Sequence, residues 1–505
     1  MISRGISCAV NGIDAYVVEV EVDIISGLPG FAIVGLPDST IKESKDRIRS
    51  ALENSGFEFP PKNYVVNLAP AGFRKQGVNY DLPIAISILK STGQGDDDDE
   101  QIPMVGELAL DGRVKPVQGV ICMAIALFRG GYKKMIVPYE NRMEAAEVEG
   151  LEVYPVKKIR DVLDVFRGDA EICKAEKYQP EEYGSGHNFS EVRGQETAKR
   201  AIEIAAAGHH NILLYGPPGS GKTMLAKRIL SVLPELTREQ AISTTMIHSV
   251  GGTLREGQGL VRRPPLRAPH HTASDVALVG GGRVPSVGEI SLAHNGVLFL
   301  DEFVEFQNNV LQALRQPLEN CEITISRASG TVSFPADFML VASSNPCQCG
   351  YYFDREIPCR CSEQKVRSYF QKISGPILDR IDMEVLMGRV PYGDLLAGGK
   401  EERSEDIRKR VTRARAFQES RFSGSKTRYN SRMNNDEVKQ YCAVDAETEK
   451  VLESALTRMH LSARGFFRIL KVARTIADLD EWETIGKQHV LEALSYKNLQ
   501  RNYDI

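Results

Sequence analysis

The stretch Gly216-Pro217-Pro218-Gly219-Ser220-Gly221-Lys222-Thr223 decides the fold of this chain. It follows four apolar residues typical of a buried strand, Ile212 to Tyr215, and a helical pattern begins near Lys222. Glycines let the backbone turn tightly, so that successive N–H groups point inward and form a nest for an anion. Lys222 then reaches the outer phosphates of a nucleotide, and the Thr223 hydroxyl is a ligand for Mg²⁺. We therefore predict a nucleoside triphosphate site formed by this run together with the next residue, Met224.

Two carboxylates follow a second short apolar run. Residues Val297 to Leu300 are typical of a buried parallel strand, and Asp301-Glu302 come directly after them. A carboxylate at the carboxyl end of such a strand lies beside the phosphate loop. We expect Asp301 to hold Mg²⁺ through water. We expect Glu302 to orient the attacking water, because phosphoryl transfer depends on positioning and charge compensation. The two motifs together predict ATP and Mg²⁺ as cofactors.

Size and composition exclude several classes of protein. The chain has 505 residues, which indicates about three domains, and 42% hydrophobic with 26% charged residues is typical of a globular protein. No apolar run approaches the roughly 20 residues that span a bilayer, and the first residues carry no signal-peptide pattern. We therefore expect a cytoplasmic protein without a membrane partner. A net charge of −4 excludes a global attraction to nucleic acid, so any DNA contact must come from local patches.

The first 170 residues alternate strand-like and helical runs. The pattern predicts a helix over residues 39–55 with Ser39 as its cap, and a second helix over residues 82–89. It predicts strands over residues 15–22, 64–68 and 134–137. The four consecutive aspartates within residues 95–101 are typical of a solvated loop and are given no metal-binding role.

Three motifs in this part resemble the proteolytic domain of the Lon family, which cleaves peptides with a Ser–Lys dyad. They are Leu68 to Gly77, Gly106 to Val114 and Ile136 to Pro138. The resemblance places the nucleophile within residues 78–82, which hold no serine, and the lysine near Ile121, which is apolar. A dyad requires both a hydroxyl and a neighbouring base. We interpret residues 1–170 as a Lon-protease-like α+β domain, of the ribosomal S5 domain 2-like fold, that serves as a structural, assembly or DNA-facing module.

The region around the phosphate loop resembles AAA+ ATPases. The resemblance assigns nucleobase contact to Gly194 and Gln195, although an ordinary helix start explains this pair nearly as well. It assigns the sensor-1 role to Asn345, which follows the apolar run 338–342. Arg380 lies in a segment similar to the arginine finger of the magnesium-chelatase and MCM branch. An arginine supplied in trans requires a neighbouring subunit and hence a ring; the alternative is a plain Asp–Arg surface pair.

An insertion separates the phosphate-loop helix from the Asp-Glu strand. Residues 248–289 are rich in glycine and basic residues, and they include Arg262, Arg263, Arg267 and the pair His270-His271. Exposed loops of this kind suit a pore or a DNA contact. For the two histidines we favour loop packing or a polymer contact over a metal site. Downstream, residues 307–319 predict a helix, and residues 323–326 and 331–334 predict a β-hairpin.

Four of the nine cysteines crowd into two C-x-C pairs separated by nine residues, namely Cys347, Cys349, Cys359 and Cys361. Four thiolates can form a tetrahedral structural zinc site, although C-x-x-C is the commoner spacing. Such a site would fold the loop directly after Asn345. The alternatives are four reduced thiols or a redox pair; we favour Zn²⁺.

The last hundred or so residues predict helices. Residues 404–421 form a strongly basic helical pattern, for which we favour a solvated helix face over a phosphate-backbone contact. Residues 462–479 predict an amphipathic helix. In the magnesium-chelatase branch the corresponding helix carries sensor 2. The resemblance therefore assigns the γ-phosphate contact to Arg464, with Arg468 second, on a lid that closes over nucleotide.

Together with Arg267 to Ser274, these motifs are similar to the ComM/YifB family of bacterial magnesium-chelatase-like AAA+ ATPases. The resemblance implies a Lon-like domain over 1–170, a linker over 171–190, a parallel-sheet α/β AAA+ core over 191–395 and a helical lid over 396–505. It implies a homo-oligomeric, hexameric ring that acts as a helicase on single-stranded or branched DNA and drives branch migration in natural transformation and homologous recombination. The rival hypotheses are a subunit of a metal-inserting chelatase and a protein-remodelling ATPase.

Overall fold

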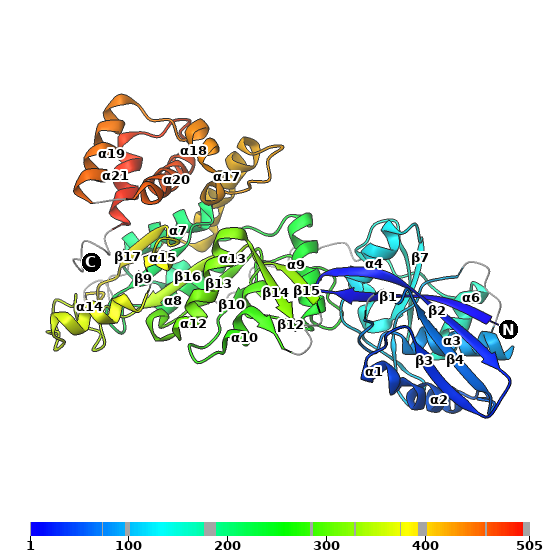
Figure 1. The fold of residues 1–505 in the computed structure, drawn as a ribbon. Helices are drawn as coiled ribbons and strands as arrows, with labels where there is room; N and C mark the ends of the chain where they lie inside the picture. Colours follow the sequence, from blue (N-terminus) through cyan, green and yellow to red (C-terminus); the bar gives the residue numbers. More distant parts are fainter. Residues whose placement is uncertain are drawn as a thin grey trace.

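The computed structural model describes residues 2–72, 74–95, 101–175, 188–282, 286–327, 330–373, 375–391, 401–459 and 462–497. Three bodies follow one another along the chain: an N-terminal α+β body at one end, a central α/β body, and a helical body packed on the central one (Figure 1). Most of the predicted linker, residues 176–187, and the predicted boundary at 395 lie outside the described residues. No helix in the described part of the chain combines the length and the apolarity needed to cross a membrane.

The N-terminal body is built on a four-stranded sheet of order β1-β2-β4-β3. Its strands are β1 (Ile2–Asn11), β2 (Asp14–Ile25), β3 (Gly30–Val34) and β4 (Asn63–Ala69), and only the β3–β4 pair among these is parallel. Helices α3 (Asp81–Thr92) and α4 (Val120–Arg129) pack on β1 and β2. A second parallel pair joins β7 (Lys134–Pro138) to β8 (Glu152–Val156). The predicted strands over 15–22, 64–68 and 134–137 and the helix over 82–89 are confirmed.

The helix predicted over residues 39–55 is wrong in two respects. It is divided into α1 (Ser39–Lys42) and α2 (Ser44–Asn54), and its cap is Asp38 rather than Ser39. Asp38 has an extended backbone, and its carboxylate accepts a hydrogen bond from the Ile41 N–H at 2.9 Å. This bond satisfies one of the amides that a helix start leaves without a partner.

The central body holds a five-stranded parallel sheet of order β10-β13-β16-β9-β17. Its strands are β9 (Ile212–Tyr215), β10 (Leu266–Arg267), β13 (Val297–Leu300), β16 (Met339–Ser344) and β17 (Met383–Leu386). Their carboxyl ends meet at one edge of the sheet, where ligands of open α/β sheets bind. The phosphate loop follows β9, Asp301 follows β13 and Asn345 follows β16, so the sheet brings all three to that edge.

The single helix predicted over residues 307–319 is also divided, into α12 (Asn308–Ala313) and α13 (Arg315–Asn320). Pro317 explains the break, because the ring of a proline inside a continuous helix clashes with the carbonyl four residues earlier, whereas the first turn of a new helix accepts it. The predicted hairpin is confirmed as the antiparallel pair β14 (Glu322–Arg327) and β15 (Gly330–Pro335).

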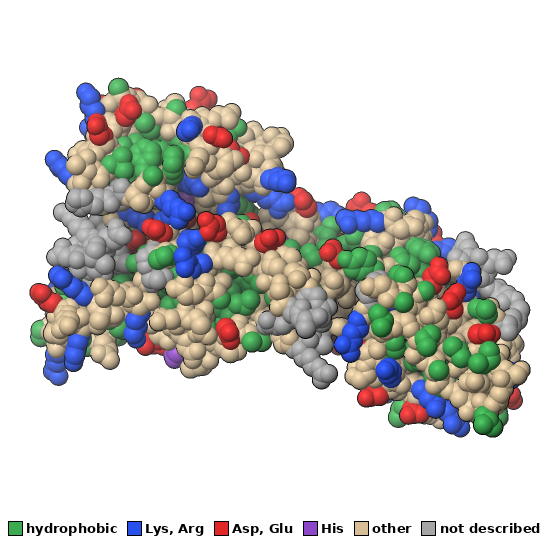
Figure 2. All heavy atoms as spheres, viewed as in Figure 1, with side chains coloured by type: hydrophobic (Ala, Val, Ile, Leu, Met, Phe, Trp, Pro, Cys, Tyr) green, Lys and Arg blue, Asp and Glu red, His purple; other side chains and the backbone are tan. Residues whose placement is uncertain are grey.

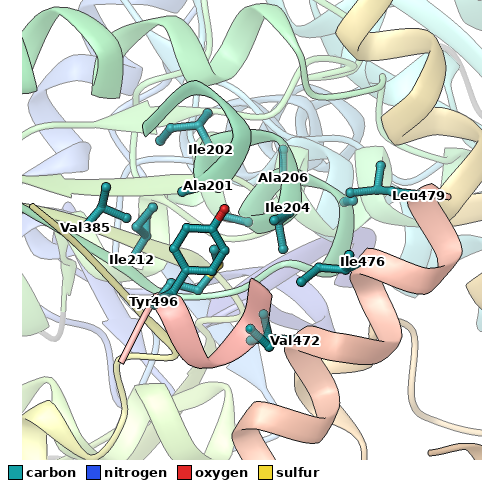
Figure 3. Close-up of a cluster of buried hydrophobic side chains, with 14 of the residues drawn as sticks. Ala201, Ile202, Ile204, Ala206, Ile212, Val385, Val472, Ile476, Leu479 and Tyr496 are labelled. Atoms are coloured by element: carbon teal, nitrogen blue, oxygen red, sulfur yellow. The ribbon is translucent and has the colours of Figure 1, made fainter. Parts of the chain in front are cut away.

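The C-terminal body consists of helices, as predicted, and it shares a core with the central body. The helices are α17 (Ser404–Arg421), α18 (Asn435–Tyr441), α19 (Ala446–Arg458), α20 (Ala463–Leu479) and α21 (Lys487–Ser495). Figure 3 shows Ile476 and Leu479 of α20 lying on the side of Ile204 and Ala206 of helix α7. Helix α7 (Glu196–Gly208) covers the parallel sheet next to β17. The helical body therefore rests on the central body through buried apolar side chains, which stabilise the contact.

Candidate active site

The phosphate loop links β9 to helix α8 (Lys222–Arg228). Gly219 and Gly221 have φ angles of 79° and 89°, which favour glycine, and a Cβ at either position would meet nothing within 4 Å. A Cβ at Gly216 would lie 2.1 Å from the carbonyl oxygen of Met387, just beyond β17. Gly216 must therefore be glycine because the Met387 backbone lies too close for a side chain. Gly219 and Gly221 favour glycine because of their positive φ angles, and the space beside them is open.

Lys222 is held inside this loop. Its ammonium donates hydrogen bonds to the carbonyl oxygens of Gly216 at 2.7 Å and Pro217 at 2.9 Å, and to Oδ1 of Asn345 at 3.3 Å. Burial lowers the pKa of Lys222 to about 8, although the negative charge of Asp301 opposes the shift. These three acceptors hold the Lys222 ammonium inside the phosphate loop. The ammonium and the N–H groups of the loop are donors that fit the phosphates of ATP.

A hydroxyl and a carboxylate meet beside the lysine. Thr223 Oγ1 donates a hydrogen bond to Oδ2 of Asp301 at 2.8 Å, and the Ser343 hydroxyl donates to the other oxygen of the same carboxylate. Hydroxyl and carboxylate oxygens are the hard ligands that Mg²⁺ prefers. The residues present therefore fit Mg²⁺. Ser343 was missed by sequence reasoning; the available signal was its position near the end of β16, two residues before Asn345.

Glu302 is held by the insertion. Its backbone is in the left-handed region, with φ 53°, and Oε2 of its half-exposed carboxylate lies 3.0 Å from Nδ1 of His271. The rings of His270 and His271 lie with centroids 4.1 Å apart. The His270-His271 pair was expected to pack in a loop or touch a polymer, so the contact with Glu302 is a new role for it. Among the described residues, only the four clustered cysteines form a group of three or more side chains suited to a metal.

Gln195 connects the phosphate loop to the end of β17. Its side-chain amide donates hydrogen bonds to the carbonyl oxygens of Ser220 at 3.1 Å and Gly388 at 2.7 Å. Gly194 and Gln195 both have φ near 60° at the start of α7. Met224, one residue past Thr223, is 47% exposed. Gly194 and Gln195 therefore lie against the phosphate loop, and their contact with the nucleobase stays a prediction.

A cavity of about 350 Å³ lies between the core and the lid, apart from the phosphate loop. Among its lining residues are five cations, Arg380, Arg432, Arg464, Arg468 and Lys471. Three carboxylates also line it, so the cavity is positive on balance. Figure 2 shows Lys and Arg side chains gathered where the lid meets the core. No phosphate-loop residue is among the described residues that line this cavity.

The two arginines assigned to the γ-phosphate thus lie together. Arg380 donates a hydrogen bond to the Pro376 carbonyl oxygen at 2.6 Å, and its ion pair is with Glu319 instead of an aspartate. The hydrogen bond from Arg380 lowers the pKa of Glu319, and the charges of Arg380 and Arg464 add to the shift. Arg464 and Arg468 line the same cavity as Arg380.

Most cations of the basic helix α17 are engaged within the chain. At least four of its six cations form ion pairs: Lys409 with Asp406, Arg410 with Glu203 and Glu402, Arg413 with Glu481, and Arg421 with Asp478. In the insertion, Arg267 makes a two-point pair with Glu289, with both N–O distances 2.6 Å. The weaker hypothesis, that α17 contacts a phosphate backbone, therefore loses most of its free charge to ion pairs that hold the lid together or onto the core.

The cysteine cluster lies against the phosphate loop. The sulfurs of Cys347, Cys349 and Cys359 are 3.3–3.7 Å apart, and all four ligand atoms, including that of Cys361, lie within 4.8 Å of one another. Four sulfurs at about 2.3 Å from one zinc ion stand about 3.8 Å apart, so the set fits Zn²⁺. All nine cysteines are free thiols. A Cβ at Gly350, inside the cluster, would lie 2.7 Å from the ring of Pro218, which shows how closely the two loops pack.

Known proteins match the whole chain. Family models of magnesium chelatase subunit ChlI match residues 20–141 and 188–395, and a model of its C-terminal part matches residues 401–497. The chain is 43% identical to competence protein ComM of Haemophilus influenzae and 41% identical to protein YifB of Escherichia coli. These matches cover 98% of this chain and 97% and 96% of the two relatives. The chain belongs to the ComM/YifB family of magnesium-chelatase-like AAA+ ATPases. Membership of the ComM/YifB family implies ATP and Mg²⁺.

The Lon likeness of the N-terminal body is confirmed as well. It is 31% identical over 128 residues to Lon protease 2 of Bacillus subtilis, a match that covers 25% of this chain and 23% of that protein. Ile121, at the expected lysine position, is apolar and buried. This member of the ComM/YifB family therefore combines a Lon-like domain with a chelatase-type AAA+ core and a helical lid.

Proposed function

We propose that this chain is one protomer of an ATP-hydrolysing ring, hexameric as the family resemblance implies, that acts on DNA as a helicase and drives branch migration. The observation that supports a ring is that the phosphate-loop residues and the arginines form two separate half-sites in one chain. Lys222, Thr223 and Asp301 meet at the carboxyl edge of the sheet, whereas Arg380 and Arg464 line a different cavity. Such half-sites complete each other when the arginines of one copy meet the phosphate loop of the next.

Each residue at the sheet edge has a proposed task. Bound ATP supplies the γ-phosphoryl group whose transfer to water releases energy. The loop N–H groups and Lys222 hold the phosphates, and Thr223 with Asp301 holds Mg²⁺. Glu302 orients the attacking water and accepts its proton, and the Asn345 amide, already within hydrogen-bond distance of Lys222, contacts the water or the outer phosphate. Gly194 and Gln195 contact the nucleobase.

For Arg464 we propose a role that differs from the sequence expectation of a lid closing over its own nucleotide. It shares one positive cavity with Arg380, so we assign both guanidinium groups to the nucleotide of the neighbouring protomer. There they would compensate the negative charge that develops on the transferring group. Cys347, Cys349, Cys359 and Cys361 we assign to a structural Zn²⁺ that stabilises the loop against Pro218.

The proposal that the ring acts on DNA is supported by the relative from Haemophilus influenzae. The Haemophilus relative is named a competence protein, and it matches this chain over nearly its full length. The rival with specific support is a metal-inserting subunit, because the family models that match all three parts are described by a magnesium chelatase subunit. Protein remodelling is supported by the Lon likeness of the N-terminal body alone.

One assay separates the three functions. ATP hydrolysis by the purified protein is measured alone, with forked or single-stranded DNA, with porphyrin and Mg²⁺ plus an extract that supplies partner subunits, and with unfolded protein. We expect stimulation by DNA and binding that weakens as salt rises, because phosphate contacts release counterions. The Glu302→Gln variant is the control for hydrolysis by a contaminant. Absence of any DNA effect at low salt, with stimulation by another ligand, would transfer the proposal to the corresponding rival.

A further inference from the structure

The start of helix α4 in the Lon-like body packs against helix α9 (Arg238–Val250) of the ATPase core. Ile121 and Cys122 from α4 form a buried apolar cluster with Ala241 of α9 and Leu260 of the insertion, each at most 6% exposed. The Cys122 thiol also lies 3.9 Å from the Met246 carbonyl oxygen. The position where Lon resemblance places the catalytic lysine is therefore covered by the ATPase.

A buried polar network crosses the same contact. The carboxylate of Glu144, 3% exposed, accepts hydrogen bonds from the Ile121 N–H at 3.2 Å, the Asn141 amide at 2.7 Å and the Ser249 hydroxyl at 2.5 Å. Ser249 belongs to α9, and its hydroxyl oxygen in turn accepts from the Gly119 N–H at 3.0 Å. Buried polar groups are costly unless paired, so this network specifies one docked arrangement of the two bodies.

Further contacts surround this network. At the rim, Arg238 lies 3.0 Å from Glu149, and Arg262 of the insertion lies 3.6 Å from Glu147. The turn between β1 and β2 reaches the hairpin β14–β15: a Cβ at Gly12 would lie 2.5 Å from Val332. In Figure 1 this hairpin lies beside the end of β1. The Lon-like body thus contacts both α9 and the hairpin.

Helix α9 occupies a mechanically important place in the chain. It follows the phosphate-loop helix α8 and the short turn η3 (Ile229–Ser231), and it leads directly into the insertion that supplies His271 to Glu302. A body that grips α9 at one point and the hairpin at another therefore sets their relative positions. Any nucleotide-driven displacement of one would be transmitted to the other.

We propose that the surface which carries the catalytic lysine in Lon proteases is here a dock for the ATPase core. Its partner is α9 of the same chain, not a peptide substrate. Through this dock the Lon-like body, α9 and the β14–β15 hairpin move as one unit and link events at the nucleotide site to the hairpin. The dock itself stands on the observed contacts; only its link to DNA stimulation rests on the proposed function.

The test uses the full chain with Ala241→Glu, which places a charge in the apolar cluster while keeping a good helix former in α9. Ser249→Ala is the milder second variant. The matched control is Glu239→Gln on the exposed face of α9, where the glutamate is 82% exposed and pairs with Arg428. Hydrogen exchange of the α4 and hairpin amides is measured with and without a non-hydrolysable ATP analogue. Basal and DNA-stimulated hydrolysis are measured in parallel.

In the unaltered protein and in Glu239→Gln we expect the analogue to change exchange in the hairpin. In Ala241→Glu we expect faster exchange at the start of α4, loss of the analogue-induced change in the hairpin, basal hydrolysis within about twofold, and loss of DNA stimulation. Ser249→Ala should show the same changes to a smaller degree. Unchanged α4 exchange, or an undocked α4 with the hairpin response intact, would overturn the proposal. If DNA does not stimulate even the unaltered protein, the exchange measurements still decide on the dock.

Discussion

His271 Nδ1 lies 3.0 Å from Oε2 of Glu302, so the insertion and the carboxylate that follows β13 are joined by a direct polar contact. A carboxylate engaged in this way is not free to orient water. We therefore expect the contact to restrain hydrolysis and movement of the insertion to release the carboxylate.

Replacing His271 tests this restraint. We expect His271→Ala to raise basal ATP hydrolysis by about two- to fivefold, because a partly exposed polar contact of this kind contributes up to about 1 kcal/mol. His270→Ala is the matched control, since no contact between His270 and Glu302 is among those described. Steady-state phosphate release at saturating ATP measures both. A fall in rate with His271→Ala alone would show that the imidazole assists catalysis instead.

Glu302→Gln should keep nucleotide binding and abolish turnover. The amide retains the size of the side chain but cannot accept the proton of the attacking water, which costs at least about a hundredfold in rate. The neighbouring Glu305→Gln is the control, because Glu305 pairs only weakly with Lys372, at 3.9 Å. Binding of a fluorescent ATP analogue and phosphate release are measured side by side. Full hydrolysis by Glu302→Gln would refute the assignment.

Mixing two inactive variants tests whether Arg380 acts between protomers. Arg380→Ala and Lys222→Ala should each lose most hydrolysis, since an arginine finger contributes about 10³–10⁵ in rate. Co-assembled in equal amounts, they should recover roughly a quarter of the sites, because a normal phosphate loop then meets a normal arginine at some interfaces. A mixture of Arg464→Ala with Lys222→Ala should recover hydrolysis in the same way. No recovery in either mixture would place the arginines at their own nucleotide.

Nucleotide affinity should fall at alkaline pH. Burial lowers the pKa of Lys222 to about 8 in the free protein, whereas bound phosphates favour the charged ammonium. Binding above pH 8 therefore requires uptake of a proton. We expect affinity to be nearly constant below pH 7 and to weaken toward about tenfold per pH unit above pH 8. Calorimetry in buffers of different ionisation enthalpy measures the proton uptake directly. Affinity that stays flat to pH 9.5 would contradict the low pKa.

Metal removal should weaken nucleotide binding. We expect about one zinc per chain by elemental analysis, and loss of it in Cys349→Ser. Because Gly350 packs against Pro218, loosening the cysteine loop should weaken ATP binding by about tenfold, or about 1.4 kcal/mol. Cys173→Ser in the Lon-like body is the control. A protein that contains no zinc after purification without chelators would favour reduced thiols or a redox pair.

Much of the site was predictable because its signals are local. The turn glycines, the apolar strands and the side chains at their carboxyl ends are neighbours in sequence, so Lys222, Asp301 and Asn345 could be expected at one edge of a parallel sheet. The basic helical pattern of residues 404–421 and the amphipathic pattern of residues 462–479 likewise placed α17 and α20 within a residue of their observed bounds. The helix breaks near Glu43 and Leu314 were missed, because a periodic apolar pattern outweighed the cap at Asp38 and the proline at 317.

The amino-acid sequence by itself determined the class of this protein: a phosphate loop on a parallel sheet, a Lon-like body and a helical C-terminal body. Only the tertiary structure decided which distant groups meet. It placed His271 on Glu302, gathered Arg464 with Arg380, paired most cations of α17 and docked α4 on α9. The physical reason is that backbone turns and periodic burial are encoded over a few residues, whereas contacts between bodies depend on how whole surfaces pack.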